Sequence, residues 1–263
     1  MPGKCWQAAP AVMLVALTAL CAATPEPDAG KWFEVKGSRA WLAPYDPTLI
    51  GRRIDSEFSF ERDAGNVSTT EIDTTVRDAW GVAKNLAFGV QLELPVKWVD
   101  TNGALASGAA DLETRTGVVH RVLSTLRWGA GLNLKFPTAS NPALRDAFEL
   151  RPILAVSWDT TPWLNLGINA AYSITPSQGV ANAVDKLELK FPVAVAISSD
   201  WSAACTYKPT WDYESDSTTH KLELDFTRLF GEKRQFAVSP GIEVPLSRQS
   251  LQWKLLLDVA WYF

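Results

Sequence analysis

Alternation of apolar and polar residues recurs from Gly51 to Phe263 and restricts the fold of this chain more than any other feature. In the segment LAFGVQLELPVKW, residues 86–98, an apolar side chain occupies every second position. Successive side chains of a strand point to opposite faces, so the segment predicts a strand with one apolar and one polar face. A tilted strand needs about 9 to 11 residues to cross a bilayer, and this segment is long enough.

Twelve such segments can be delineated, and their even number permits a closed barrel. The fold class we predict is all-β: a transmembrane antiparallel up-and-down β-barrel of about 12 strands over residues 51–263. The predicted strands are residues 52–62, 67–80, 86–98, 111–122, 127–136, 148–158, 163–174, 187–197, 201–213, 221–230, 235–246 and 251–263.

The connections between these segments alternate in length. The longer polar ones are residues 99–110, 138–147 and 175–186, and we expect them to be extracellular loops. The opposite side has short turns, which is typical of the periplasmic side of an outer-membrane barrel. Both ends of the barrel segment are expected on this short-turn side.

Residues 1–23 have the features of a signal peptide, because Lys4 precedes the apolar run AVMLVALTAL and small residues lead up to Ala23. Export leaves Cys205 as the last cysteine of the mature chain, so no internal disulfide is expected. Residues 24–50 predict a periplasmic N-terminal extension, either a plug in the barrel or an arm outside it. The predicted location is the bacterial outer membrane, and a mean hydropathy of -0.03 agrees with strands that are half apolar.

Tryptophan placement supports the same register. The indole ring prefers the membrane interface, where its ring is apolar and its N–H is hydrated. All nine tryptophans from Trp80 onward lie within about two residues of a predicted strand end, as two aromatic girdles require. The predicted membrane-interface anchors are Trp98, Trp128, Trp158, Trp163, Trp201, Trp211, Trp253 and Trp261.

Prolines within the predicted strands oppose this register, because each removes a donor from the hydrogen-bond ladder. We expect local bulges or displaced strand boundaries near them. The residues concerned are Pro95, Pro152, Pro192, Pro209 and Pro240. A soluble secreted sandwich or small ligand-binding barrel is the alternative that these prolines leave open.

The polar faces of the strands would line the interior, and their acidic and basic residues nearly balance. Close spacing along single strands, such as Glu93 with Lys97 or Glu188 with Lys190, suggests paired charges in a confined lumen, where an unpaired charge is costly. The candidate lumen-lining residues are Glu93, Lys97, Glu113, Arg115, Lys135, Glu149, Arg151, Glu188, Lys190, Lys254 and Asp258.

The sequence offers little for other chemistry. A pI near 5.3 and the lack of a basic run give no case for nucleic-acid binding. No His or Cys pair has metal-ligand spacing, and no cofactor is predicted. His120 and His220 lie on strands far apart in the predicted order, so they do not suggest a catalytic triad, although an outer-membrane lipid hydrolase stays an alternative.

Three segments, KNLAFGVQLELPVKW, GAADLETRTGVVHRV and WGAGLNLKFPTAS, resemble the core of the outer-membrane β-barrel transporter family labelled meta-pathway of phenol degradation. The matching residues are Gly108, Asp111, Leu112, Pro137 and Thr138, whereas Ala110 and Ala139 replace glycines of the family pattern. The resemblance implies an outer-membrane barrel that passes small aromatic or other hydrophobic compounds. It supplies no catalytic residues.

Together these features predict a passive channel for small solutes that contacts outer-membrane lipid. The main alternative is a closed structural or surface-interaction barrel. The last segment, LQWKLLLDVAWYF, has an apolar stripe that reaches Phe263. It must pair with the first strand so that no edge is left in lipid. A terminal aromatic of this kind resembles the signal read by the barrel-assembly machinery, so Phe263 is the predicted assembly signal.

Overall fold

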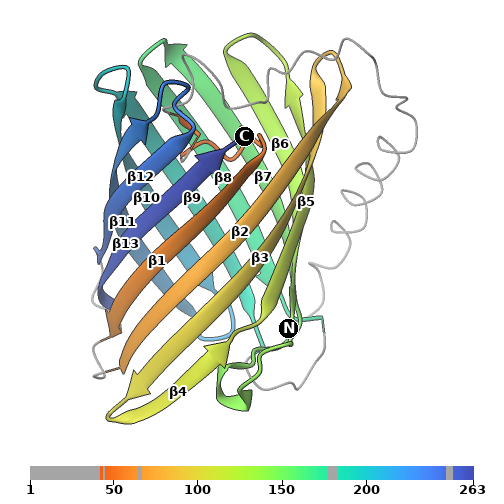
Figure 1. The fold of residues 1–263 in the computed structure, drawn as a ribbon. Coiled ribbons are helices and arrows are strands. Elements are labelled where there is room, and N and C mark those ends of the chain that lie inside the picture. The colour runs from red at the N-terminus through yellow and green to blue at the C-terminus, as the bar shows by residue number, and fades with distance from the viewer. Residues whose placement is uncertain (1–41, 44, 64–66, 177–182, 247–250) are drawn as a thin grey trace.

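The computed structural model describes residues 42, 43, 45–63, 67–176, 183–246 and 251–263 and shows a closed antiparallel β-barrel (Figure 1). The predicted signal peptide, most of the N-terminal extension and parts of three loops lie outside these residues. Among the described residues, no helix is long and apolar enough to cross a membrane.

Twelve strands form the ring, and the predicted fold class is confirmed. They are β1 (Arg53–Asp63), β2 (Val67–Ala83), β3 (Leu86–Thr101), β5 (Leu112–Arg121), β6 (Leu126–Phe136), β7 (Glu149–Thr161), β8 (Leu164–Ile174), β9 (Asp185–Ala196), β10 (Trp201–Asp212), β11 (Ser217–Phe230), β12 (Phe236–Pro245) and β13 (Leu251–Tyr262). Each pairs with its neighbours along the chain, and β1 pairs with β13 to close the ring.

A thirteenth strand, β4 (Ala104–Ala109), pairs with the outer part of β3 and extends that hairpin beyond the barrel (Figure 1). The prediction of a loop over residues 99–110 is therefore wrong, because β3 continues to Thr101 and β4 occupies most of the remainder. Asn102 and Gly103 both have positive φ, and the Gly103 N–H donates to Asp100 Oδ1 at 2.7 Å. An Asn-Gly pair favours a tight hairpin turn of this kind, so the strands continue to it.

The in-strand prolines interrupt the ladder without shifting it. Around Pro152 the β7–β8 partners stop at Leu150 and resume at Ile153 in the same register, and Pro240 leaves a similar gap in β12. The expected bulges at these two prolines are wrong. Register shifts occur instead near strand ends, as between Asp159 and Thr161. A missing donor removes one bond, whereas a bulge would turn every later side chain to the other face.

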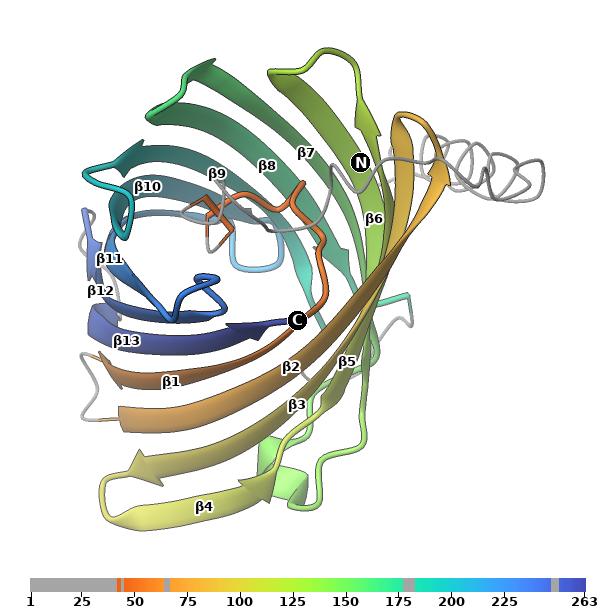
Figure 2. The same ribbon diagram turned by 45° about the horizontal axis from the view of Figure 1, so that its top comes forward.

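The two faces of the wall differ as the alternation predicts. Outward positions carry large apolar side chains, such as Leu257 and Val259 on β13, and these are exposed. Inward positions are small or polar, with Ala194, Ala237 and Ala260 almost fully buried. The small inward residues make room for the described part of the N-terminal extension, which lies inside the ring (Figure 2).

Candidate functional site

A cavity of about 340 Å³ lies within the barrel between the N-terminal segment and the inner wall. Its basic lining residues are Arg53, Arg77, Arg115 and Lys190. Its acidic lining residues are Asp46, Asp55, Asp78, Glu57, Glu223, Asp225 and Asp258. Both signs of charge face one small volume, as the sequence suggested for the lumen.

Hydrogen-bond donors form a continuous row across one side of the wall. Successive cross-strand partners on β1, β2, β3, β5, β6 and β7 all carry a guanidinium or amide group. We call this set the arginine row; its members are Arg53, Arg77, Gln91, Arg115, Asn133 and Arg151. Neighbouring strands are about 4.8 Å apart, so the row is a track of closely spaced donors.

The arginine row is incompletely satisfied by the protein. Arg53 donates to Asp55 at 3.0 Å, and Arg77 also pairs with Asp55 at 3.0 Å. Arg151 pairs with Glu188 at 2.7 Å. Within the described part of the chain, no carboxylate lies at ion-pair distance from Arg115, and its Nε is buried without an acceptor. Arg115 is therefore the guanidinium of the row with most capacity left for a ligand.

The wall across from the arginine row has compensated charges. Lys208 on β10 forms ion pairs with Glu223 and Glu243, and Lys221 reaches the same Glu243 at 2.9 Å. Two ammonium groups thus share two carboxylates on β10, β11 and β12. This network carries little net charge of its own, whereas the cavity as a whole is lined by seven carboxylates and four cationic groups. The arginine row can therefore act on a solute through local contacts and not through the net field of the lumen.

The predicted lumen residues either line the cavity or contact polar groups on the same strand, a neighbouring strand or a loop. Arg115, Lys190 and Asp258 line the cavity. Four of the others form ion pairs with a neighbouring group: Lys97 with Glu71 at 3.0 Å, Arg151 with Glu188 at 2.7 Å, Lys254 with Glu57 at 3.8 Å, and Lys135 with Asp146 at 2.6 Å. Glu113 lies 4.0 Å from Lys135, and Glu149 is the cross-strand partner of Lys135. Glu93 accepts a hydrogen bond from Gln91 at 3.2 Å.

The pairing pattern differs from the one expected along single strands. Glu188 and Lys190 do pair, at 3.3 Å. Lys97, however, pairs across to β2 rather than with Glu93. Cross-strand partners are about 5 Å apart, whereas residues four apart along a strand are about 13 Å apart. Lys97 therefore pairs with Glu71, which lies opposite it, and not with Glu93.

The predicted interface tryptophans lie near strand ends on the outer wall. Trp128, Trp158, Trp163 and Trp261 are strongly exposed there. The remaining predicted anchors are half-buried among neighbours: Trp98, Trp201, Trp211 and Trp253. Several of these tryptophans pack against outward phenylalanines: the ring centroids of Trp253 and Phe60 are 5.3 Å apart, and those of Trp261 and Phe263 are 5.2 Å apart.

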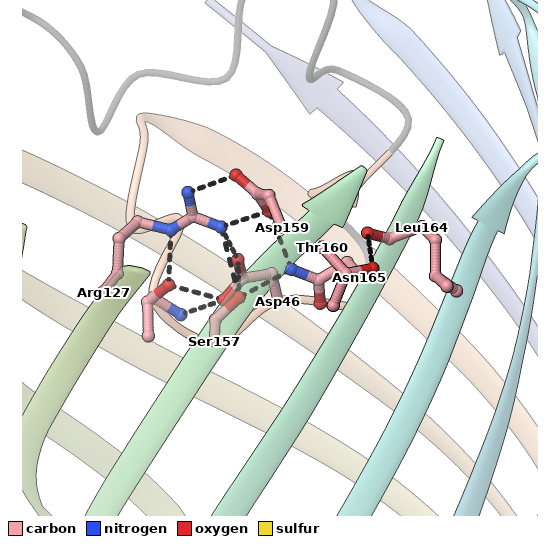
Figure 3. A network of polar contacts seen from close by, with 8 residues as sticks. Asp46, Arg127, Ser157, Asp159, Thr160, Leu164 and Asn165 are labelled. Carbon is pink, nitrogen blue, oxygen red and sulfur yellow. Dashed lines mark hydrogen bonds and ion pairs between the residues drawn. The ribbon is translucent and has the colours of Figure 1, made fainter. Parts of the chain in front are cut away.

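A buried arginine holds the N-terminal segment against β6, β7 and β8 (Figure 3). The Arg127 side chain has no exposed surface and donates to both oxygens of Asp159, at 2.8 and 2.9 Å. It also donates to Asp46 at 2.7 Å and to Thr48 at 3.1 Å. Ser157 donates to the same Asp46 oxygen at 2.6 Å. One guanidinium thus joins the barrel wall to the segment.

Two further contacts fix this segment elsewhere on the ring. The Tyr45 hydroxyl donates to Thr227 on β11 at 2.6 Å, and burial raises the pKa of Tyr45, which keeps the donor protonated. The Ala43 carbonyl accepts from Arg53 on β1 at 2.8 Å. The described segment therefore crosses the short-turn end of the lumen and contacts opposite walls (Figure 2).

We call the contacts that join Asp46 and Thr48 to Arg127, Ser157 and Asp159 the latch. The sequence predicted little of it. Arg127 has the inward parity of its strand, which is a usable signal. Asp46 and Thr48 gave none, because Asp46 lies 81 residues from Arg127 and 111 from Ser157 in the chain.

The two histidines lie on the outer wall and not in the lumen. His120 packs against Trp128 with ring centroids 6.0 Å apart. His220 shares a 2.7 Å hydrogen bond between its Nδ1 and the Tyr207 hydroxyl. The part of the chain that the structure describes has no group of three metal-ligating side chains.

Comparison with protein-family models gives no match, so the phenol-degradation family stays a resemblance. No curated protein matches significantly either. Solved structures do match, although at low identity. An outer membrane channel from Pseudomonas putida F1 has a TM-score of 0.66 and 13% identity over 81% of this chain and 96% of that one.

Two further structures have the same architecture. The CymD monoaromatic hydrocarbon channel has a TM-score of 0.57 and 9% identity over 85% of this chain and 93% of that one. The KdgM porin in complex with disordered oligogalacturonate has a TM-score of 0.51 and 14% identity over 80% and 99%. At these identities the structural similarity shows that the fold is shared and shows nothing about function. This chain has the fold of the transmembrane β-barrels that form channels and porins of the bacterial outer membrane.

Proposed function

We propose that the protein is a passive outer-membrane channel for small solutes, with a preference for solutes that carry a negative charge. The observation that carries the proposal is the arginine row, six consecutive donor residues facing one lumen. A guanidinium binds a carboxylate or sulfonate in a bidentate manner. Arg115, which has no ion-pair partner among the described residues, is the main contact for such a solute.

The proposed class of anionic solutes is narrower than the class expected from the sequence. The phenol-degradation resemblance suggested aromatic or hydrophobic compounds, and CymD is described as a monoaromatic hydrocarbon channel. A lumen lined by charged groups disfavours a bare hydrocarbon, because those groups would lose water without gaining a partner. An aromatic compound bearing an acidic group fits both features. Its ring passes along the small inward residues while its anionic group moves along the arginine row.

Solute passage depends on the state of the N-terminal segment. The segment lies across the short-turn end of the lumen and is held by Arg127, Tyr45 and Arg53. This arrangement also supports the second candidate, a closed structural barrel. The two functions differ in one measurable respect, which is solute flux.

Flux into liposomes tests the proposal with aromatic ions of similar size and permanent charge. Benzenesulfonate is expected to enter faster than benzyltrimethylammonium when the protein is present. Arg115→Gln, alone or with Arg77→Gln, is expected to reduce this difference several-fold, since one or two cationic contacts are lost.

The matched control is Arg62→Gln, which removes the same charge from an exposed position at the outer end of β1. It should leave the preference unchanged. Equal entry of both ions into liposomes holding folded protein would rule out the anionic preference. No entry of either ion would favour the closed barrel.

A further inference from the structure

Arg228 faces outward near the short-turn end of the wall, on the face that contacts lipid. Arg228 alternates along β11 with Phe226 and Phe230, which are 43% and 38% exposed. Its cross-strand partners are Trp201 on β10 and Val238 on β12. Apolar residues thus surround a charge that would ordinarily be costly in contact with lipid.

The position of Arg228 places it at the level of lipid headgroups. Phe230 ends β11 at the short-turn side, and Arg228 precedes it by two residues, about 7 Å along the strand. Trp201 begins β10 at the same level. Aromatic residues of this kind mark the interface, where phosphate groups of the periplasmic leaflet lie.

The guanidinium is held by rings rather than by acids. Its Cζ lies 5.0 Å from the centre of the Trp201 ring and 4.7 Å from that of Phe230. Across the described residues, no carboxylate or carbonyl accepts a hydrogen bond from Arg228. Asp200, which directly precedes the cross-strand partner Trp201, forms an ion pair with Arg234 at 3.1 Å. The five N–H donors of Arg228 therefore keep their capacity for an external acceptor.

We infer that Arg228, flanked by Trp201 and Phe230, is a binding site for the phosphate group of a periplasmic-leaflet phospholipid. A planar guanidinium matches two phosphate oxygens, and the rings keep it oriented while they contact the upper acyl chains. This site is on the outer wall and is independent of the channel function. Its ligand is part of the membrane itself, and its effect is to hold the short-turn ends of β10 and β11 at the level of the headgroups.

Native mass spectrometry of the purified barrel with bound phosphatidylglycerol tests the site. Arg228→Gln is expected to lower the occupancy of the most tightly retained phospholipid about tenfold, as expected for one lost charge-assisted bond. Arg228→Lys keeps the charge but loses the planar fork, so an intermediate loss is expected. Arg62→Gln, at the outer end of β1, should change nothing.

Two probes identify the source of the phosphate. Diacylglycerol, which lacks the phosphate, should not be retained, and millimolar inorganic phosphate should not displace the lipid. Heat-modifiable migration shows that each variant is folded, and Arg228→Lys supplies the comparison if Arg228→Gln is not. Undiminished phospholipid retention by the folded variants, or equal retention of diacylglycerol, overturns the inference. Displacement by inorganic phosphate would make the site a simple anion site and overturn its lipid assignment.

Discussion

Arg127 joins the N-terminal segment to the barrel wall through a fully buried guanidinium. Its guanidinium lies between Asp46 of the N-terminal segment and Asp159 of the wall, and none of its surface is exposed. A buried charge needs such partners, since its desolvation is costly. Asp159 and Ser157 of the wall also accept hydrogen bonds from Arg127. We therefore expect the wall to keep Arg127 in place without Asp46, as a preformed receptor for the segment.

This arrangement predicts different effects for the two partners of the latch. Arg127→Gln removes the cation shared by Asp46 and Asp159, although both carboxylates keep hydrogen-bond donors, and should destabilise the barrel by about 3 kcal/mol. Asp46→Asn removes the ion pair between Arg127 and the segment but leaves Arg127 paired with Asp159. It should loosen the segment and raise channel conductance while leaving the wall intact. Thermal unfolding on heat-modifiability gels and bilayer conductance measure the two effects. Asp216→Asn, in an exposed turn, is the control; equal effects of both latch variants on stability would argue against a preformed receptor.

Gly117 and Gly131 face each other on β5 and β6 and permit close contact of the two strands. A Cβ on Gly117 would lie 2.8 Å from the Ala130 carbonyl oxygen, which is too close. Gly117→Ala should therefore force the strands apart and cost about 1 to 3 kcal/mol. Urea unfolding in detergent measures this, with the adjacent outward change Thr116→Val as control. An unchanged midpoint would show that the wall yields at this position.

At the scale of elements, alternation predicted the strands because it follows from the two environments of a barrel wall. Each predicted segment corresponds to a ring strand, including β3 and β13. The hairpin of β3 and β4 was missed although Asn102-Gly103 signals it, because the small residues after Gly103 lack an apolar stripe. The latch could not be predicted, since it depends on contacts between residues that are distant in the chain.

The β3–β4 hairpin projects beyond the barrel and should be dispensable for its closure (Figure 1). Joining Val99 to Ala106 through a two-residue turn removes its tip, while Trp98 keeps its partner Ser107. The shortened protein should still migrate as a heat-modifiable barrel and still admit benzenesulfonate. Loss of folded protein would show that the hairpin takes part in closing the ring.

At the scale of the whole molecule, pairing of β1 with β13 closes the ring and leaves no strand edge in lipid. Eleven residues of β1 have partners in β13, from Arg53 with Tyr262 to Asp63 with Leu251. An unclosed edge in lipid would leave backbone donors and acceptors unsatisfied. The even number of strands predicted from the sequence agrees with this closure.

Phe263 follows β13 and is 51% exposed on the outer wall, where the assembly machinery could reach it. We predict that Phe263→Ala lowers the fraction of folded barrel in cells more than it lowers the stability of the purified protein. Phe236→Ala, at a similarly exposed aromatic on β12, is the matched control. Equal losses for both variants, measured by outer-membrane fractionation, would remove the special role of Phe263.

Single-channel recording of the purified, folded protein in planar bilayers tests the central claim most directly. The account predicts discrete conductance steps and, in a KCl gradient, a reversal potential on the anion-selective side, because the arginine row offers anions a series of closely spaced local contacts. Asp46→Asn should enlarge the steps. A folded protein that gives no conductance, with or without the Asp46 latch, would contradict the assignment of this barrel as a channel.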